Sequence, residues 1–281
     1  MLPENSYLAG ISDIQQDKNT YQQQNLAKQQ TELPILERLS KKERAAKSNF
    51  VKAKRIIKGS GNPENALKLY NEALSLMENS TDNNLRAAIH FERGKLFDDF
   101  DYAEFALKDY NSATKCTDNN LKTHAHLKMG RIYDDYVMFD PAVEQYSLAV
   151  ETSEEAKNPN GKTKALTYLA ALFADRYDKE NTETFNALSV DAAYETGNMK
   201  TVAKTLMGAG ENFEYINEDI KALSAYKEAA KAAHSIKDYN LLSKSYEAAS
   251  GTMDRLGNGA KAMTLLSKAL LYRQKSELQE D

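Results

Sequence analysis

The sequence predicts an all-α fold: a right-handed superhelical α-solenoid of about six helix-turn-helix units. Three observations predict it. Twenty residues are written nearly twice, only five prolines and twelve glycines interrupt 281 residues, and apolar residues recur at three- and four-residue spacing among helix formers. Sustained alternation of apolar and polar residues is missing, so the sequence gives β-structure little support.

The duplicated stretch predicts the first helix of two successive units. Residues 81–100 read "TDNNLRAAIHFERGKLFDDF" and residues 117–136 read "TDNNLKTHAHLKMGRIYDDY", 36 positions later. Asp and Asn offer side-chain oxygens to the free N–H groups of a helix start. We therefore expect Asp82 and Asp118 to cap helices. We expect the same of Asn62 and Asp140, each followed by a helix-starting proline.

A second pattern marks the second helix of each unit: a small residue, an aromatic or apolar residue four later, and an alanine three after that. Glycine or serine stands twelve residues before the first member in four units, at Gly94, Gly130, Gly210 and Ser250. In the fourth unit Ala171 takes this place, with three extra residues expected in the turn "DKENTET". The predicted triplets are Ala66, Tyr70, Ala73; Ala106, Tyr110, Ala113; Ala142, Tyr146, Ala149; Asn186, Val190, Ala193; Ala222, Tyr226, Ala229; and Ala262, Leu266, Ala269.

This pattern resembles the tetratricopeptide repeat over residues 41–277, although the family's first-helix Trp is missing. Its spacing is longer than the usual ~34 residues, as in the long-helix branch of kinesin light chains and bacterial peptide-sensing regulators. The resemblance implies a solenoid over residues 34–277. A Gln-rich segment, 1–33, is expected to be disordered or loosely docked, and 278–281 to form an acidic tail. The predicted units are about 41–80, 81–116, 117–157, 160–197, 198–237 and 238–277.

In tetratricopeptide proteins one stripe of the first helices lines a concave groove. Counting the small residue as zero, the stripe comprises positions minus six, minus three, plus one and plus four. The minus-three row reads Val51, Phe91, Leu127, Tyr168, Met207, Glu247, and the plus-four row reads Lys58, Asp98, Asp134, Asp175, Glu214, Asp254.

An apolar track beside an acidic row suits a peptide or amphipathic helix that carries Lys or Arg. In the competing interpretations the acids are solvated or neutralised at i, i+3, and Phe91, Tyr168 and Met207 belong to the core. The candidate partner-binding residues are Phe91, Lys95, Asp98, Leu127, Arg131, Asp134, Tyr168, Asp175, Met207, Glu211 and Glu214.

Residues 35–58 carry nine basic and two acidic side chains, which predicts an amphipathic helix with a cationic face. An alternative function is therefore a peripheral membrane or trafficking adaptor. A third is a regulator whose solenoid tightens around a signalling peptide. The basic face comprises Lys41, Lys42, Arg44, Lys47, Arg55 and Lys58.

Other function classes find little support. A net charge of −4 gives no overall attraction to nucleic acid, and the first residues lack a secretory pattern, so a cytoplasmic location is expected. Cys116 is the single cysteine and the four histidines lie without metal-site spacing. We expect no enzyme, no cofactor and no metal. The predicted function is a non-catalytic adaptor that binds a protein or peptide, of unknown oligomeric state.

Overall fold

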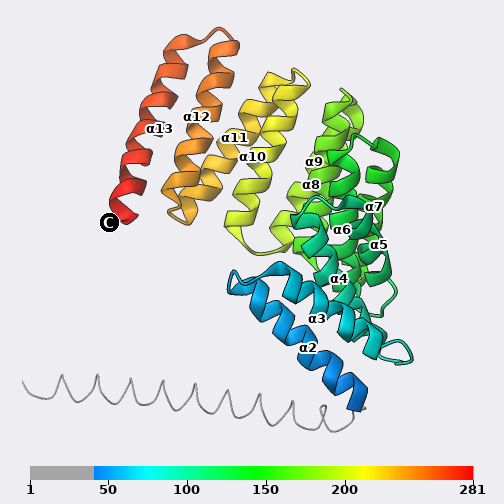
Figure 1. Cartoon of the computed structure of the whole chain (residues 1–281). Coiled ribbons are helices and arrows are strands. Elements are labelled where there is room, and N and C mark those ends of the chain that lie inside the picture. The colour runs from blue at the N-terminus through cyan, green and yellow to red at the C-terminus, as the bar shows by residue number, and fades with distance from the viewer. Residues whose placement is uncertain (1–40, 281) are drawn as a thin grey trace, which may run out of the picture. The chain divides into compact units, whose positions relative to one another are not determined.

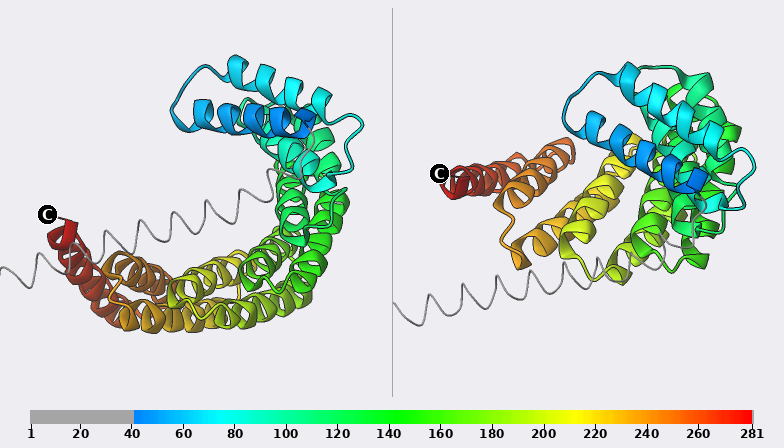
Figure 2. Two further views of the ribbon diagram at one scale, coloured as in Figure 1. Left: turned by 90° about the horizontal axis from the view of Figure 1, so that it is seen from below. Right: turned by 60° about the horizontal axis from the view of Figure 1, so that its bottom comes forward.

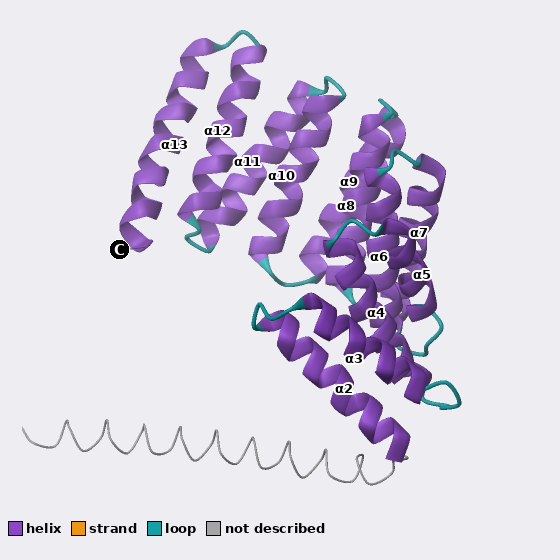
Figure 3. Ribbon diagram, in the orientation of Figure 1, coloured by secondary structure: helices purple, strands orange, loops and turns teal. Residues whose placement is uncertain are grey.

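A computed structural model describes residues 41–280 of the chain. In this range the backbone forms helices and turns, with no strand (Figures 1 and 3), so the all-α prediction is confirmed. The chain divides into two compact units, one ending at Asp82 and the other beginning at Asn83. The predicted N-terminal segment, 1–33, lies outside the described residues.

Each compact unit is built from antiparallel helix pairs. The first holds α2 (Lys41–Lys58) and α3 (Pro63–Leu76). The second holds five pairs, namely α4 (Asn83–Asp99) with α5 (Ala103–Ala113), α6 (Asn119–Asp135) with α7 (Phe139–Glu155), α8 (Pro159–Asp175) with α9 (Lys179–Glu195), α10 (Met199–Tyr215) with α11 (Asp219–Ser235), and α12 (Tyr239–Arg255) with α13 (Gly259–Glu280). Because α13 continues to Glu280, residues 278–280 extend a helix rather than form a separate tail.

The length of the repeat follows from its parts. From α6 to α12 every helix has 17 residues, and three residues join each helix to the next. Two such helices with two such turns make the long repeat seen in the sequence. The pair α4/α5 is shorter because α5 has only 11 residues.

The three-residue turns share one backbone conformation. The middle residue of each has a positive φ, between 51° and 76°. Glycine provides it at Gly197 and Gly257, whereas Val137, a β-branched residue, adopts a φ of 60°. A positive φ strains side chains branched at Cβ. The turn geometry is therefore set by the packing of the helices on either side and not by local preference.

Small residues and tyrosines fill the core between the helices. Ala142, Ala149 and Tyr146 are fully buried on α7 and pack with leucines of α8. In the first compact unit Phe50 of α2 lies against the buried Tyr70 of α3, with ring centroids 6.2 Å apart. The alternation of small and large residues that revealed the repeat is thus a packing pattern.

Two of the expected helix caps are confirmed. Asn62 accepts a hydrogen bond from the N–H of Glu64 at 2.8 Å, and Asp118 accepts from the first-turn N–H groups of α6. The expectation for Asp140 is wrong, because α7 already begins at Phe139 and Asp140 lies inside its first turn. The turn between α6 and α7 has the same three residues as its neighbours, so α7 begins at Phe139.

The asparagines of the duplicated stretch join successive pairs. The Asn84 side chain accepts a hydrogen bond from the Thr117 N–H at 3.0 Å. One pair later, Asn120 accepts from the Asn158 amide at 2.8 Å. Each first helix is thereby tied to the residue that precedes or caps the next first helix, which accounts for the repeated asparagine in structural terms.

Candidate partner-binding wall

The first helices of the second compact unit form one continuous wall. Helices α4, α6, α8, α10 and α12 contact one another in succession, whereas successive second helices make no comparable contacts in residues 83–280. Elements that touch on one side and diverge on the other curve toward the touching side. The first helices therefore line the inner side of the curve that α4 to α13 describe in Figure 2. We call this surface the concave wall.

Glycine and tyrosine fix the register between the two helices of a pair. A Cβ atom added to Gly130 would lie 2.5 Å from the Tyr146 ring, and one added to Gly210 would lie 2.3 Å from the Tyr226 ring. No side chain fits there, so the tyrosine lies flat against the helix backbone. Three pairs use this arrangement: Gly94 with Tyr110, Gly130 with Tyr146, and Gly210 with Tyr226.

The register predicted for the fourth unit is wrong. The turn between α8 and α9 has three residues, 176–178, as in the neighbouring pairs, so "DKENTET" contains no insertion. Ala170 stands where the other pairs have glycine, and not Ala171. Tyr168 and Asp175 consequently lie one residue beyond the minus-three and plus-four rows.

The error has a physical cause. The triplet of α9 is Thr182, Asn186 and Ser189, and all three side chains are buried. These polar residues stand where other units have the Ala, Tyr, Ala series. A search for apolar residues therefore finds its match at Asn186, Val190 and Ala193, four residues, or about one helical turn, too late. Asn186 accepts a hydrogen bond from Asn212 at 2.9 Å, but its own amide nitrogen is buried without a partner.

The first unit needs a smaller correction. Four residues, 59–62, join α2 to α3, so the small position is the buried Ala53 rather than Lys54. Phe50, not Val51, is then the counterpart of Phe91. In the corrected register the minus-six row is Lys47, Ala88, His124, Lys164, Lys204, Lys244; the minus-three row is Phe50, Phe91, Leu127, Thr167, Met207, Glu247; and the plus-four row is Ile57, Asp98, Asp134, Ala174, Glu214, Asp254.

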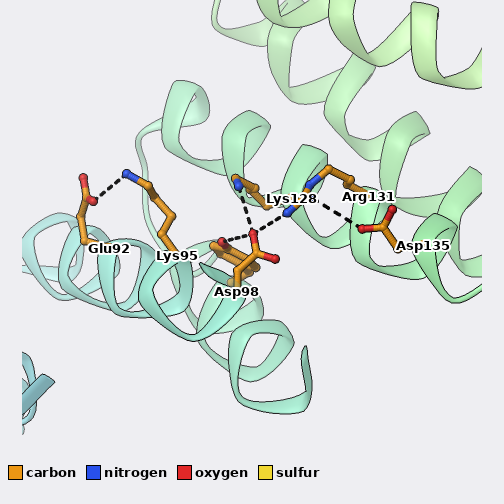
Figure 4. Close-up of polar contacts among 7 residues, drawn as sticks. Glu92, Lys95, Asp98, Lys128, Arg131 and Asp135 are labelled. Atoms are coloured by element: carbon orange, nitrogen blue, oxygen red, sulfur yellow. Dashed lines mark hydrogen bonds and ion pairs between the residues drawn. The ribbon is translucent and has the colours of Figure 1, made fainter. Parts of the chain in front are cut away.

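Asp98 is neutralised by the next first helix. Its carboxylate accepts from Lys128 at 3.0 Å, from Arg131 at 2.6 Å and from the Tyr110 hydroxyl at 3.2 Å (Figure 4). Burial raises the pKa of this carboxyl, but the two cations outweigh it and the pKa lies below its usual value. Lys95 pairs instead with Glu92 at 2.9 Å. Neutralisation of the acidic row thus occurs here, between units rather than at i, i+3.

Asp134 occupies the same position on α6 and has a different environment. Burial, followed by the charges of Asp175 and Asp135, raises the pKa of the Asp134 carboxyl. Arg131 points to Asp98 and to Asp135. Within the described residues neither Asp134 nor Asp175 has an ion-pair partner.

The position of these acids also opposes the helix dipole. Asp134 and Asp175 lie in the last turns of α6 and α8, where the partial negative charge of the helix end disfavours a carboxylate by about 0.3–1 kcal/mol. The buried Tyr146 hydroxyl is close enough to Asp134 to lower the pKa of that carboxyl, but by less than burial and the two neighbouring acids raise it. The arrangement leaves negative charge that a cation from outside would stabilise.

The acids of α10 are partly neutralised. Glu214 accepts hydrogen bonds from Thr252 and Arg255 of α12, and Arg255 also contacts Asp219 at 3.0 Å. Burial and the charge of Glu214 raise the pKa of Glu211. Glu214 therefore resembles Asp98, whereas Glu211 keeps an uncompensated charge.

The apolar row is divided between core and surface. Leu127 is 8% exposed and belongs to the core. Phe91 packs against Tyr110 with ring centroids 5.6 Å apart, and Met207 packs against two core clusters. Tyr168 is 37% exposed and stacks on Tyr146 at 5.0 Å. Among the apolar candidates, Tyr168 offers the most accessible ring.

One charged cluster was not predicted from the sequence. Asp109 of α5 is 2% exposed and contacts His90 at 2.8 Å and Arg93 at 2.7 Å, both on α4. Burial raises the pKa of Asp109, but the opposing effect of Arg93 and His90 is larger, so the pKa lies below its usual value. No spacing rule connects residues 16 and 19 apart on two helices. The cluster joins α4 to α5 and lies in the core.

The predicted basic face lies on α2. Its members are exposed except Lys47, which is half-buried. No ion pair of the described residues involves Lys41, Arg44 or Arg55. In residues 41–280 no helix is long and apolar enough to cross a membrane, and no group of three or more His, Cys, Asp and Glu side chains is placed to hold a metal ion.

Comparison with solved structures decides the fold. RapI in its apo form matches with a TM-score of 0.72, at 15% identity, over 97% of this chain and 76% of that chain. The nearly identical TPR-like repeats of a candidate kinesin light chain from Podosopora anserina match with a TM-score of 0.56, at 10% identity, over 70% and 98% of the two chains. The fold is tetratricopeptide-like.

A further match of this tetratricopeptide-like chain is a Rap protein complexed with Competence and Sporulation Factor. The TM-score is 0.55, at 14% identity, over 91% of this chain and 72% of that chain. No protein-family model matches the sequence, and no curated protein matches it. The likeness is therefore one of fold.

Proposed function

We propose that this tetratricopeptide-like protein is a non-catalytic adaptor whose concave wall binds a peptide or amphipathic helix of a partner protein. The observation that carries the proposal is the pair Asp134 and Asp175. Both lack an ion-pair partner in the described residues, both lie at helix C-termini, and burial with the charge of Asp175 raises the pKa of Asp134. Carboxylates placed this way disfavour the free protein and favour a complex with a cation.

Tyr168 supplies the apolar part of the same region. Its ring is held by stacking on Tyr146 and remains 37% exposed. A rigid, partly exposed aromatic ring beside unpaired acids suits a Lys or Arg whose stem packs on the ring while its charge reaches the carboxylates. One protein of this fold is complexed with Competence and Sporulation Factor, which supports a binding role for the fold.

Selection from a displayed peptide library tests the proposal. The wild-type full chain is expected to enrich peptides with Lys or Arg beside an apolar residue. The double variant Asp134→Asn with Asp175→Asn is expected to bind the selected peptide about tenfold or more weakly, which corresponds to a loss of about 1.4 kcal/mol of binding free energy. Asp191→Asn with Glu228→Gln removes two exposed acids from second helices and serves as the matched control. Equal binding by the Asp134/Asp175 variant and the control contradicts the proposal.

A second function rests on α2. Its exposed basic residues, with Ile57 37% exposed, suit an anionic membrane surface. Co-sedimentation with phosphatidylserine vesicles at low salt is the test, with Arg44→Gln and Arg55→Gln as the variant. Failure of the wild-type chain to co-sediment removes this alternative.

A further inference from the structure

The corrected register brings three lysines into one row. Lys164, Lys204 and Lys244 occupy the minus-six position of α8, α10 and α12. Counted from Ala171, the minus-six position of the fourth unit would be Ala165, whereas counted from Ala170 it is Lys164. On the same helices the acids lie near the opposite end. Ten residues separate the two rows, about 15 Å along a helix.

These lysines carry free positive charge. All three are exposed, and none forms an ion pair within residues 41–280. The charge of Lys204 contributes to lowering the pKa of Asp238, but the Asp238 carboxylate forms its ion pair with Lys200, at 2.9 Å. The lysine row is thus a cationic edge of the concave wall, opposite the acidic edge at Asp134 and Asp175.

A cleft of about 340 Å³ lies between two of the lysines. Its sides come from α8 and α10. The buried Thr163 and Thr205 lie beside the ring of Tyr168. The cleft is lined by Asn160, Thr163, Lys164, Thr167, Tyr168, Thr201, Lys204 and Thr205.

We propose that the cleft between α8 and α10 binds an acidic, extended segment of a partner protein, with carboxylates on Lys164, Lys204 and Lys244. Charge complementarity selects an anion. The hydroxyls of Thr163 and Thr167 donate to carbonyls of their own helix and keep lone pairs for peptide N–H groups, and the Asn160 amide can donate and accept. Packed helices lie about 8–10 Å apart. An extended chain in the polyproline II conformation rises about 3.1 Å per residue with three residues per turn, so every third side chain lies on the same face. Acidic residues at every third position would therefore meet successive lysines.

A nucleic acid fits this wall less well. Its phosphates form an unbroken line of negative charge, whereas Glu211 and Glu214 lie on α10 about two and three turns from Lys204. A peptide can place acids on one edge and a basic residue on the other. The inference rests on the proposed function, because it describes a second part of the same groove, but its chemistry is opposite and separately testable.

Fluorescence anisotropy with a synthetic probe tests it. The probe is a labelled peptide with glutamate at every third position and alanine or tyrosine between, titrated at low salt with the wild-type full chain. Lys164→Gln with Lys204→Gln is expected to weaken binding about tenfold. Lys227→Gln with Lys231→Gln changes two exposed lysines of the second helix α11 and should leave affinity within about twofold. No binding by the wild-type chain, or equal losses in both variants, overturns the proposal.

Carbodiimide cross-linking gives an independent readout. Mass spectrometry of the cross-linked probe is expected to place glutamates on Lys164, Lys204 or Lys244 and not on Lys227 or Lys231; the reverse pattern overturns the proposal. A single-stranded RNA that binds more tightly than the probe and is lost with the same lysines also overturns it. Asp134→Asn with Asp175→Asn should leave probe binding intact, so failure of the acidic site and failure of the lysine row are distinguishable.

Discussion

Asp98 and Asp134 occupy the same position on successive first helices and differ in what surrounds them. Asp98 receives Lys128, Arg131 and the Tyr110 hydroxyl. Asp134 has no ion-pair partner among the described residues, and burial together with Asp175 and Asp135 raises its pKa. The comparison shows that identical residues at one position of a repeat can have different environments: Asp98 joins two helix pairs, and Asp134 keeps a charge that no cation of the described residues neutralises.

The largest expected change in stability comes from the contact between glycine and tyrosine that both helix pairs share. Gly130→Ala would place a Cβ 2.5 Å from the Tyr146 ring, and the resulting overpacking should lower the free energy of unfolding by about 1–3 kcal/mol. Urea unfolding measures it. Gly251→Ala is the matched control, because nothing lies within 4 Å of that Cβ, and it should stabilise helix α12 by up to about 1 kcal/mol. Equal effects of both changes would contradict the register.

Removing each acid tests the comparison itself. Asp98→Asn leaves Lys128 and Arg131 without their shared carboxylate and should destabilise by about 1–2 kcal/mol. Asp134→Asn removes a charge from a helix C-terminus beside other acids and should stabilise by about 0.3–1 kcal/mol. Thermal and urea unfolding of the two variants should therefore shift in opposite directions. Destabilisation by both would show that Asp134 also has a structural partner.

The pH dependence of unfolding should differ in sign. The folded-state pKa of Asp98 is lowered, so its contribution is present above the unfolded value of about 3.9 and is lost as the pH falls through the folded pKa. For Asp134 the folded pKa is raised. Its ionisation therefore destabilises the fold as the pH rises above about 3.9 and through the folded pKa.

Two variants separate these contributions. Asp98→Asn should reduce the loss of stability on acidification. Asp134→Asn should gain stability at neutral pH, and this gain should vanish near pH 3, where the wild-type carboxyl is protonated too. Urea midpoints measured across this range give both curves. Parallel curves for wild type and Asp134→Asn would contradict the raised pKa.

The turn that follows each acid gives the smallest effect. The turn after Asp98 has Asp101 at its positive-φ position, and the turn after Asp134 has Val137, with φ of 60° in both. Valine is strained there, so Val137→Gly should stabilise by about 0.5–1 kcal/mol, glycine's chain entropy offsetting part of the relief. Gly257→Val places the same strain in a turn with no neighbour within 4 Å and should destabilise. A loss of stability in Val137→Gly would contradict the strain.

Much of the fold could be predicted from the sequence because small and aromatic residues alternate at helical spacing. Ala142, Tyr146 and Ala149 are buried as their spacing requires. The fourth unit could not be aligned, since Thr182, Asn186 and Ser189 are buried without being apolar. The spacing of apolar residues identifies a helix face only when that face is apolar, and it does not contain the constant length of the turns.

The candidate site was less accessible to sequence reasoning. The interpretation in which Lys95 neutralises Asp98 at i, i+3 is wrong. Asp98 pairs instead with Lys128 and Arg131 of the next first helix, 30 and 33 residues away in sequence. Such pairs depend on the angle between first helices, which no local spacing encodes. The lysine row was hidden for the same reason as the fourth unit, because one residue of shift moves a side chain by about 100° around a helix.

The most direct test of the central claim is a calorimetric titration of one peptide, selected on the wild-type chain, into three proteins. The account predicts that Asp134→Asn with Asp175→Asn weakens binding about tenfold or more, whereas Asp98→Asn, at a temperature where it is folded, stays within about twofold of wild type. A larger loss in Asp98→Asn than in the Asp134/Asp175 variant would contradict it.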